Sequence, residues 1–257
     1  MHLEFITNVE KNTNFNIEVK EFFQSKKTPD FETWKNFLSE RAHGTFAIII
    51  DTKDYIYAAV DKVRKFPVFY STKYLKVTSK LKELLKSENG ITIDQSQLLL
   101  TFFSGYTIGN KTLYNDIVTL DPGQCLILNK GEKSIRVENY FNLTGVKSSA
   151  LSSGDLKKQF KEILIHTFEN IKNLQRPIYV PLSGGMDSRL VVSILKELNC
   201  RDVYSFSYGD INNHEVKTAK RVSEKLNVEW SFFPLNNAIQ RSAMLSEEFK
   251  KYLSNFD

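Results

Sequence analysis

Residues 181–188, Pro-Leu-Ser-Gly-Gly-Met-Asp-Ser, combine the side chains that phosphate chemistry requires at close spacing. The two adjacent glycines permit positive φ angles and close approach, so that successive backbone amides can surround a phosphate. The hydroxyls of Ser183 and Ser188 can add hydrogen bonds to it. The Asp187 carboxylate would repel bound phosphates unless a divalent cation lay between them, which makes Asp187 a candidate Mg²⁺ ligand in a metal–triphosphate site.

A strand and a helix are predicted on either side of this segment. The apolar run at 178–182 indicates a buried strand, and the periodic apolar residues of 188–198 indicate a helix. In an open α/β sheet, ligands bind at such a turn, because free N–H groups and the helix dipole favour an anion there. The alternative is that Ser-Gly-Gly forms only a tight turn and that Asp187 and Ser188 only cap the helix. The spacing does not match the Gly-x-x-x-x-Gly-Lys of a Walker-type loop.

The rest of the second half alternates between helix and strand patterns. A helix is predicted from Asp155, its expected N-cap, to about residue 173. Its apolar face comprises Leu156, Phe160, Ile163, Leu164, Phe168 and Ile171. Further strands are predicted at 203–208 and 228–233, and further helices at 213–226 and 244–256. Strands that alternate with helices indicate a parallel sheet with right-handed crossovers.

The first half has the turn signals of antiparallel hairpins. Strands are predicted at 46–51 and 55–60 around a short polar turn, at 68–71 and 74–78, and at 125–128 after a Pro-Gly turn. Helical spacing predicts helices at about 31–38, with Asp30 as N-cap, and at 93–103. Residues 145–154 are small and polar, which is typical of a connector between domains.

Length and composition favour two domains. The chain has 257 residues, 41% hydrophobic and 25% charged, so it can bury a substantial core, and disorder is excluded for most of it. No apolar stretch approaches the roughly 20 residues that cross a bilayer, and the N-terminal residues lack an export signal. A cytoplasmic location without membrane association is therefore expected. The net charge of +5 comes from scattered lysines, which does not indicate nucleic-acid binding, and Cys125 and Cys200 are expected to be reduced, partly buried thiols.

The string Ser-Gly-Gly-Met-Asp-Ser resembles the pyrophosphatase loop, SGGxDS, of the N-type ATP pyrophosphatases, and its surroundings resemble the asparagine synthetase-like group. The resemblance implies that the loop grips the pyrophosphate of ATP while a substrate carboxylate attacks the α-phosphate. The resulting acyl-adenylate would be converted to an amide by ammonia or an amine. The resemblance assigns the pyrophosphate to Ser183, Gly184, Gly185 and Ser188, Mg²⁺ to Asp187, the border of the adenine to Leu182 and Tyr208, and catalysis to Asp187 and Ser188.

Residues 43–51 and 61–70 resemble the second half of a class II glutamine amidotransferase domain, whose pattern is Gly-x-Phe-Ala followed by Asp-Arg-x-Gly-x-x-Pro-Leu-Tyr-Tyr. Residues 105–114 and 121–123 resemble the segment that leads to the synthetase domain. The chain lacks the N-terminal cysteine nucleophile, the Asn-Gly-Glu strand and the glutamine-binding arginine of these domains, so no glutaminase activity of its own is expected. The family's second acidic loop and catalytic lysine find no match either, and the ATP domain is therefore expected to be incomplete at its C-terminus.

We therefore predict an α/β protein with a degenerate amidotransferase-like sandwich at residues 1–145 and a parallel-sheet, adenine nucleotide α-hydrolase-like (PP-loop) domain at 155–257. The expected activity is that of an asparagine synthase-like carbon–nitrogen ligase, dependent on ATP and Mg²⁺ and forming AMP and pyrophosphate. Its other substrates would be a small-molecule or peptide carboxylate and ammonia or an amine. One alternative is a truncated or split chain that only binds nucleotide or pairs with a partner chain supplying the C-terminal half. Another is an SGGxDS enzyme that acts on tRNA, although the amidotransferase-like half and the weak basic charge oppose it.

Overall fold

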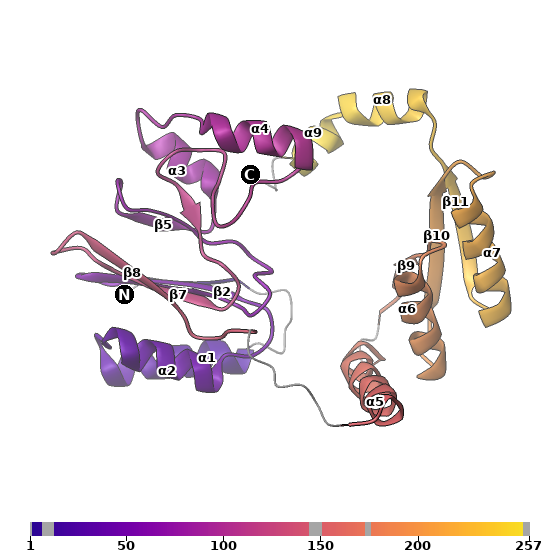
Figure 1. Ribbon diagram of the computed structural model, residues 1–257, viewed down its shortest axis with the longest axis horizontal. Helices are drawn as coiled ribbons and strands as arrows, with labels where there is room; N and C mark the ends of the chain where they lie inside the picture. Colours follow the sequence, from indigo (N-terminus) through magenta and orange to yellow (C-terminus); the bar gives the residue numbers. More distant parts are fainter. Residues whose placement is uncertain (1, 7–12, 144–150, 173–175, 254–257) are drawn as a thin grey trace. The chain divides into compact units, whose positions relative to one another are not determined.

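Two units with different kinds of β-sheet make up the chain. They comprise Met1–Val146 and Lys147–Phe256. The computed structural model describes residues 2–6, 13–143, 151–172 and 176–253 (Figure 1). Most of the connector predicted at 145–154 lies outside these residues. Within the described ranges, no helix combines the length and the apolar character that a membrane span requires.

The first unit contains two antiparallel sheets. Its larger sheet has the strand order β1-β2-β3-β7-β8, and its smaller sheet has the order β5-β4-β6. The strands of the larger sheet are β1 (His2–Ile6), β2 (Ala47–Asp51), β3 (Tyr55–Val60), β7 (Gln124–Asn129) and β8 (Ser134–Asn139). Those of the smaller sheet are β4 (Phe69–Ser71), β5 (Lys76–Thr78) and β6 (Val118–Thr119). Both predicted hairpins are confirmed, because β2 pairs with β3, and β4 with β5, in antiparallel fashion.

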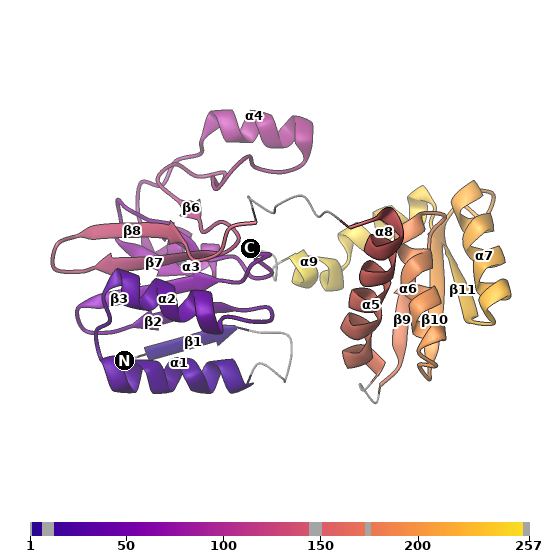
Figure 2. The ribbon, with the colours of Figure 1, turned by 60° about the horizontal axis from the view of Figure 1, so that its bottom comes forward.

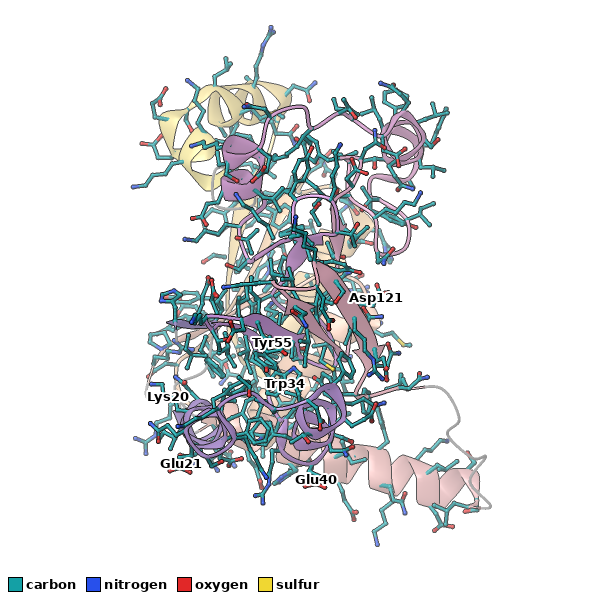
Figure 3. All side chains as sticks on the ribbon, turned by 90° about the vertical axis from the view of Figure 1, so that its left-hand side faces the viewer. Lys20, Glu21, Trp34, Glu40, Tyr55 and Asp121 are labelled. Atoms are coloured by element: carbon teal, nitrogen blue, oxygen red, sulfur yellow. The ribbon has the colours of Figure 1, made fainter. Side chains whose placement is uncertain are left out.

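The larger sheet lies between two apolar layers. Helices α1 (Thr13–Lys26) and α2 (Phe31–Arg41) cover one face, and the smaller sheet packs on the other (Figures 1 and 2). Trp34 of α2 is fully buried between the helices and the sheet (Figure 3). Along β2, Ile48 points into the helix-side core and Ile49 into the other core. Because successive side chains alternate between two buried faces, this strand has the sequence of a continuous apolar run.

Helix starts in the first unit follow their capping residues. Asp30 caps α2 as predicted, since its carboxylate accepts the Thr33 amide at 2.8 Å. Helix α4 (Gln95–Ser104) begins two residues later than predicted, because Asp94 is its N-cap. The elements β1, α1, β8 and α3 (Leu81–Ser87) were not predicted.

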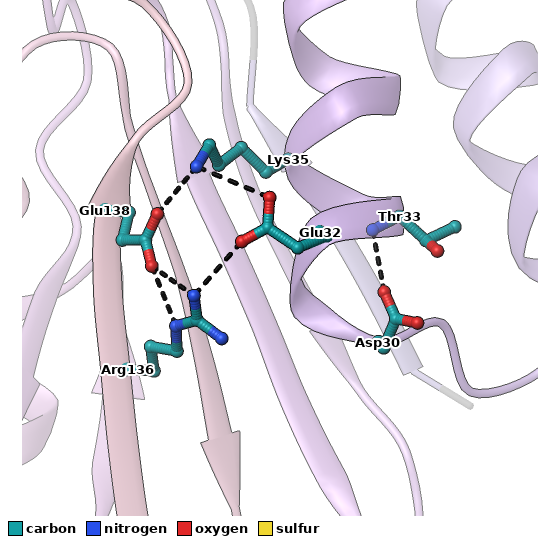
Figure 4. Close-up of polar contacts among 6 residues, drawn as sticks. All are labelled: Asp30, Glu32, Thr33, Lys35, Arg136 and Glu138. Carbon is teal, nitrogen blue, oxygen red and sulfur yellow. Dashed lines mark hydrogen bonds and ion pairs between the residues drawn. The ribbon is translucent and has the colours of Figure 1, made fainter.

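An ion-pair network at the surface ties α2 to strand β8 (Figure 4). Glu138 accepts hydrogen bonds from Lys35 at 2.7 Å and from Arg136, and Arg136 also reaches Glu32 at 3.1 Å. The hydrogen bonds from Lys35 and Arg136 lower the pKa of Glu138. Exposed pairs of this kind each contribute little to stability, so the network orients α2 on a sheet that the apolar core already holds.

The sheet of the second unit has three parallel strands, in the order β11-β10-β9. They are β9 (Ile178–Pro181), β10 (Val203–Gly209) and β11 (Glu229–Pro234), connected by helices α6 (Met186–Glu197) and α7 (His214–Leu226) (Figure 2). Strand β10 pairs in parallel with both neighbours, which confirms the predicted parallel sheet. Buried residues of this core are Val180, Leu182, Val192, Leu195, Ala219 and Val228.

Helix α5 (Ser153–Lys172) differs from its prediction at its start. Asp155 is not the N-cap, because the helix begins at Ser153 and the Ser152 hydroxyl accepts the Asp155 amide at 3.2 Å. Phe168 and Ile171 pack on the core of the second unit. The predicted helix is confirmed, but the N-terminal half of its apolar face is uncovered: 44%, 59% and 64% of the residue surface is exposed in Leu156, Phe160 and Ile163.

The helix predicted at 244–256 is confirmed in part, because α9 (Glu247–Leu253) lies within this range and residues 254–256 lie outside the described residues. Helix α8 (Asn237–Leu245), which ends inside the range, was not predicted. Ser246 separates the two helices, because its backbone is extended and its hydroxyl accepts the Phe249 amide at 3.1 Å, as an N-cap does.

Candidate functional site

A tight turn connects the carboxyl end of β9 to the N-terminus of α6. Strand β9 ends at Pro181 and α6 begins at Met186, two residues earlier than predicted. Gly185 is the N-cap residue and provides no side-chain cap. The first-turn amides and the positive end of the helix dipole therefore face the position at which an anion would bind.

Two serine hydroxyls hold the turn together. The Ser183 N–H donates to Ser188 Oγ at 3.1 Å, and the two Oγ atoms lie 3.0 Å apart. The Gly185 N–H donates to Ser183 Oγ at 3.2 Å. Because one of the two O–H groups suffices for the contact between the hydroxyls, the other can donate to a ligand. The structure thus brings Ser183 and Ser188 together, but it uses them partly for the turn itself.

The two glycines contribute differently from the prediction. Neither has a positive φ, and the φ of Gly185 is −70°, so the expectation of left-handed glycines in this loop was wrong. Gly184 is required by close packing instead. A Cβ atom at this position would lie 2.9 Å from the Cα of Glu215 in α7. The absence of a side chain therefore allows the start of α7 to approach the loop.

Leu182 and Tyr208 line one small pocket next to the turn, at the ends of β9 and β10. Leu182 is 3% exposed and Tyr208 is 60% exposed. The pocket has a volume of about 150 Å³, below the roughly 300–1,000 Å³ of pockets that enclose a whole drug-sized ligand. It has room for one ring of a ligand. Ser207 and Glu215 also line it, and the sequence prediction gave neither residue a role in the site.

Asp187 lies in the first turn of α6 with an exposed side chain. Among the residues that the structure describes, no group of three or more His, Cys, Asp or Glu could hold a metal ion. Mg²⁺ is commonly held by one or two carboxylates together with substrate phosphates. A single exposed carboxylate beside an anion-binding turn fits that kind of site, and it does not fit a cage made by the protein alone.

Asp61, in the amidotransferase-like segment, has a structural role. Its fully buried carboxylate accepts the amides of Phe46 at 3.0 Å, Val63 at 2.8 Å and Lys65 at 3.1 Å. These bonds fix the chain after β3 and leave Asp61 without access to solvent. Asp61 is therefore used to hold the local fold of this segment.

Comparison with known proteins agrees with this division. The family model described as "Glutamine amidotransferase domain" matches residues 30–141, and the one described as "Queuosine biosynthesis protein QueC" matches residues 178–254. Asparagine synthetase (glutamine-hydrolyzing) 1 of Bacillus subtilis is 24% identical over 204 residues, which cover 77% of this chain and 32% of that protein. A Methanocaldococcus jannaschii protein assigned as asparagine synthetase (glutamine-hydrolyzing) 2 is 27% identical over 176 residues, covering 64% and 33%. This chain is similar to these asparagine synthetases over most of its own length.

The chain spans about a third of the length of these two relatives. Among solved structures, the NH3-dependent NAD synthetase from Campylobacter jejuni is 20% identical with a TM-score of 0.29, over 38% of this chain and 43% of that chain. The glutamine phosphoribosylpyrophosphate amidotransferase from B. subtilis is 12% identical with a TM-score of 0.30, over 91% and 70%. Both structural similarities are too weak to assign a fold, and the fold class follows from the antiparallel and parallel sheets described above.

Proposed function

We propose that the second unit binds ATP with Mg²⁺ at residues 182–188, as the nucleotide site of an asparagine synthase-like amide ligase that forms AMP and pyrophosphate. The observation that carries the proposal is the turn between β9 and α6, where the linked hydroxyls of Ser183 and Ser188 adjoin the N-terminus of a helix. The pyrophosphate of ATP would lie there. The pocket beside Leu182 and Tyr208 would receive the adenine ring.

The proposed reaction has two steps. An oxygen of the substrate carboxylate attacks the α-phosphorus of ATP, the bond from that phosphorus to the bridging oxygen breaks, and pyrophosphate leaves. Ammonia or an amine then attacks the acyl carbon and loses a proton, and AMP leaves with the bonding electrons. Charge that develops on the departing pyrophosphate would be stabilised by the preorganised amides and by the one hydroxyl of Ser183 and Ser188 that is left to donate. When bound at Asp187, Mg²⁺ would neutralise part of the phosphate charge.

The carboxylate substrate needs groups beyond those in the pocket. The residues that line the pocket include the acidic Glu215 and no lysine or arginine. A carboxylate brought next to ATP requires a positive charge or several hydrogen-bond donors. We therefore include in the proposal a partner polypeptide that contributes these groups and thereby completes the site for a small-molecule or peptide carboxylate.

Calorimetric titration of the 257-residue chain with ATP, with and without Mg²⁺, tests the proposal. We expect the wild-type chain to bind in a Mg²⁺-dependent manner. Asp187→Asn should weaken the Mg²⁺-dependent binding at least about tenfold, without loss of fold, because the side chain is exposed. Glu224→Gln, at the far end of α7, removes the same charge from an exposed position and should leave the affinity unchanged. A wild-type chain that does not bind ATP, or an Asp187→Asn chain that binds equally well, would contradict the nucleotide site.

A further inference from the structure

A buried serine connects strand β10 to the loop. The Ser207 hydroxyl donates to the carbonyl of Leu182 at 2.7 Å and accepts the indole N–H of Trp230, in β11, at 2.9 Å. Ser207 is only 5% exposed. The one O–H group of Ser207 donates to the Leu182 carbonyl, and both partners of the hydroxyl are groups of the protein itself.

The Leu182 carbonyl lies where the regular ladder between β9 and β10 has ended. The last residue pair of that ladder is Pro181 with Phe206. The Leu182 N–H still donates to the Phe206 carbonyl at 2.8 Å, whereas the Leu182 carbonyl is bonded by a side chain. An unpaired buried carbonyl costs free energy, so the Ser207 hydroxyl favours the one backbone direction in which the carbonyl is satisfied.

The peptide group between Leu182 and Ser183 is thereby held at both ends. Its C=O accepts from Ser207, and its N–H donates to Ser188 Oγ at 3.1 Å. Because a peptide group is planar, fixing both ends fixes the orientation of the plane. The backbone of the loop continues from this peptide group, so the direction of the following amides depends on the orientation of its plane.

We propose that Ser207 and Trp230 are positioning residues for the loop. Trp230 orients the Ser207 hydroxyl, Ser207 holds the Leu182 carbonyl, and this peptide group sets the direction of the amides that would face the pyrophosphate. The inference rests on the proposed function for its ligand, but the positioning itself can be measured without one. Trp230 does not line the pocket but packs on the core of the second unit, and Trp230→Phe keeps an aromatic ring there while it removes the N–H that donates to Ser207.

Hydrogen exchange of the nucleotide-free chain tests the positioning. We expect the Ser183 amide, followed by NMR, to exchange about fivefold faster in Ser207→Ala, which corresponds to the loss of one hydrogen bond. Ser205→Ala is the matched control, because Ser205 lies on the same strand, is 2% exposed and bonds to the Glu229 carbonyl at 3.0 Å, away from the loop. Ser207→Thr keeps the hydroxyl and should restore slow exchange. Equal acceleration of Ser183 exchange in Ser207→Ala and Ser205→Ala would overturn the inference.

Titration with ATP and Mg²⁺ tests the consequence for binding. We expect about tenfold weaker affinity in Ser207→Ala and a smaller loss in Trp230→Phe, with less than a twofold change in Ser205→Ala. If both Ser207 variants and Trp230→Phe bind as tightly as Ser205→Ala, the positioning role is refuted. If the wild-type chain does not bind ATP although exchange at Ser183 responds to Ser207→Ala, the proposed function fails and the positioning of the loop stands.

Discussion

Gly184 in the loop and Glu215 at the start of α7 lie so close together that a Cβ atom on Gly184 would stand 2.9 Å from the Glu215 Cα. The neighbouring atom belongs to the backbone, so it cannot move aside as a flexible side chain would. The loop therefore packs directly against the backbone of the first turn of α7.

Gly184→Ala should therefore destabilise the second unit and displace the loop. Overpacking of this kind costs about 1–3 kcal/mol, and we also expect ATP binding to be lost. Thermal unfolding and calorimetric titration measure the two effects. The control is Gly154→Ala in α5, where a Cβ would lie 3.6 Å from the nearest atom, the Ser152 hydroxyl oxygen, and where alanine should be neutral or stabilising. A Gly184→Ala chain as stable as this control would show that α7 can move away without cost.

Asp61→Asn should destabilise the first unit. The substituted amide nitrogen cannot accept a hydrogen bond, so at least one of the three backbone amides that now donate to Asp61 loses its acceptor inside the protein. Bonds to a charged acceptor contribute about 1.5–3 kcal/mol each, and we expect a loss of about 2 kcal/mol in denaturant unfolding. The exposed Asp54→Asn, in the β2–β3 turn, should change stability by less than about 0.5 kcal/mol. Equal effects of the two substitutions would argue against the structural role of Asp61.

The two cysteines should react with thiol reagents at very different rates. Cys125 is fully buried, and burial raises the pKa of its thiol to about 12, whereas Cys200 is only partly buried and its thiol pKa is also raised. The thiolate is the reactive form. At pH 8, we expect one thiol to be labelled in the native chain and both after unfolding. In Cys200→Ser, labelling of the native chain should nearly disappear; fast labelling of that variant would mean that Cys125 is accessible.

The stability of the first unit should fall at alkaline pH, because burial raises the pKa of two of its tyrosines. Burial raises the pKa of Tyr57 from 10.0 to about 12, and it also raises the pKa of Tyr140. The folded chain therefore holds these protons more tightly than the unfolded chain does. The associated stability is fully present below about pH 10 and is lost as the pH rises toward 12.

Denaturant unfolding at several pH values, followed by the fluorescence of Trp34 in a Trp230→Phe chain, measures this loss. Tyr57→Phe should remove part of the pH dependence above pH 10. At neutral pH the same substitution should cost about 1 kcal/mol, because the Tyr57 hydroxyl donates to the Pro29 carbonyl at 3.0 Å. An unchanged alkaline slope in Tyr57→Phe would exclude Tyr57 as a source of the effect.

Local patterns in the sequence determined most of the secondary structure. The hairpins of the first unit, the Asp30 cap of α2 and the alternation of parallel strands with helices in the second unit all follow from periodicity and turn residues within a few positions. The place of the loop between β9 and α6 followed in the same way. Helix α1 was missed although Phe15, Val19 and Phe23 have helical spacing.

Only the tertiary structure decided how these elements meet. Three features join residues of different elements: the approach of Gly184 to α7, the packing of Phe168 but not of Phe160 on the core, and the bonds of Ser207 to Leu182 and Trp230. Periodicity reports which face of an element is apolar, but it does not report which neighbour covers that face or where the cover ends. For the same reason the sequence by itself identified the loop and its residue types, whereas the packing of β10, β11 and α7 determined its conformation.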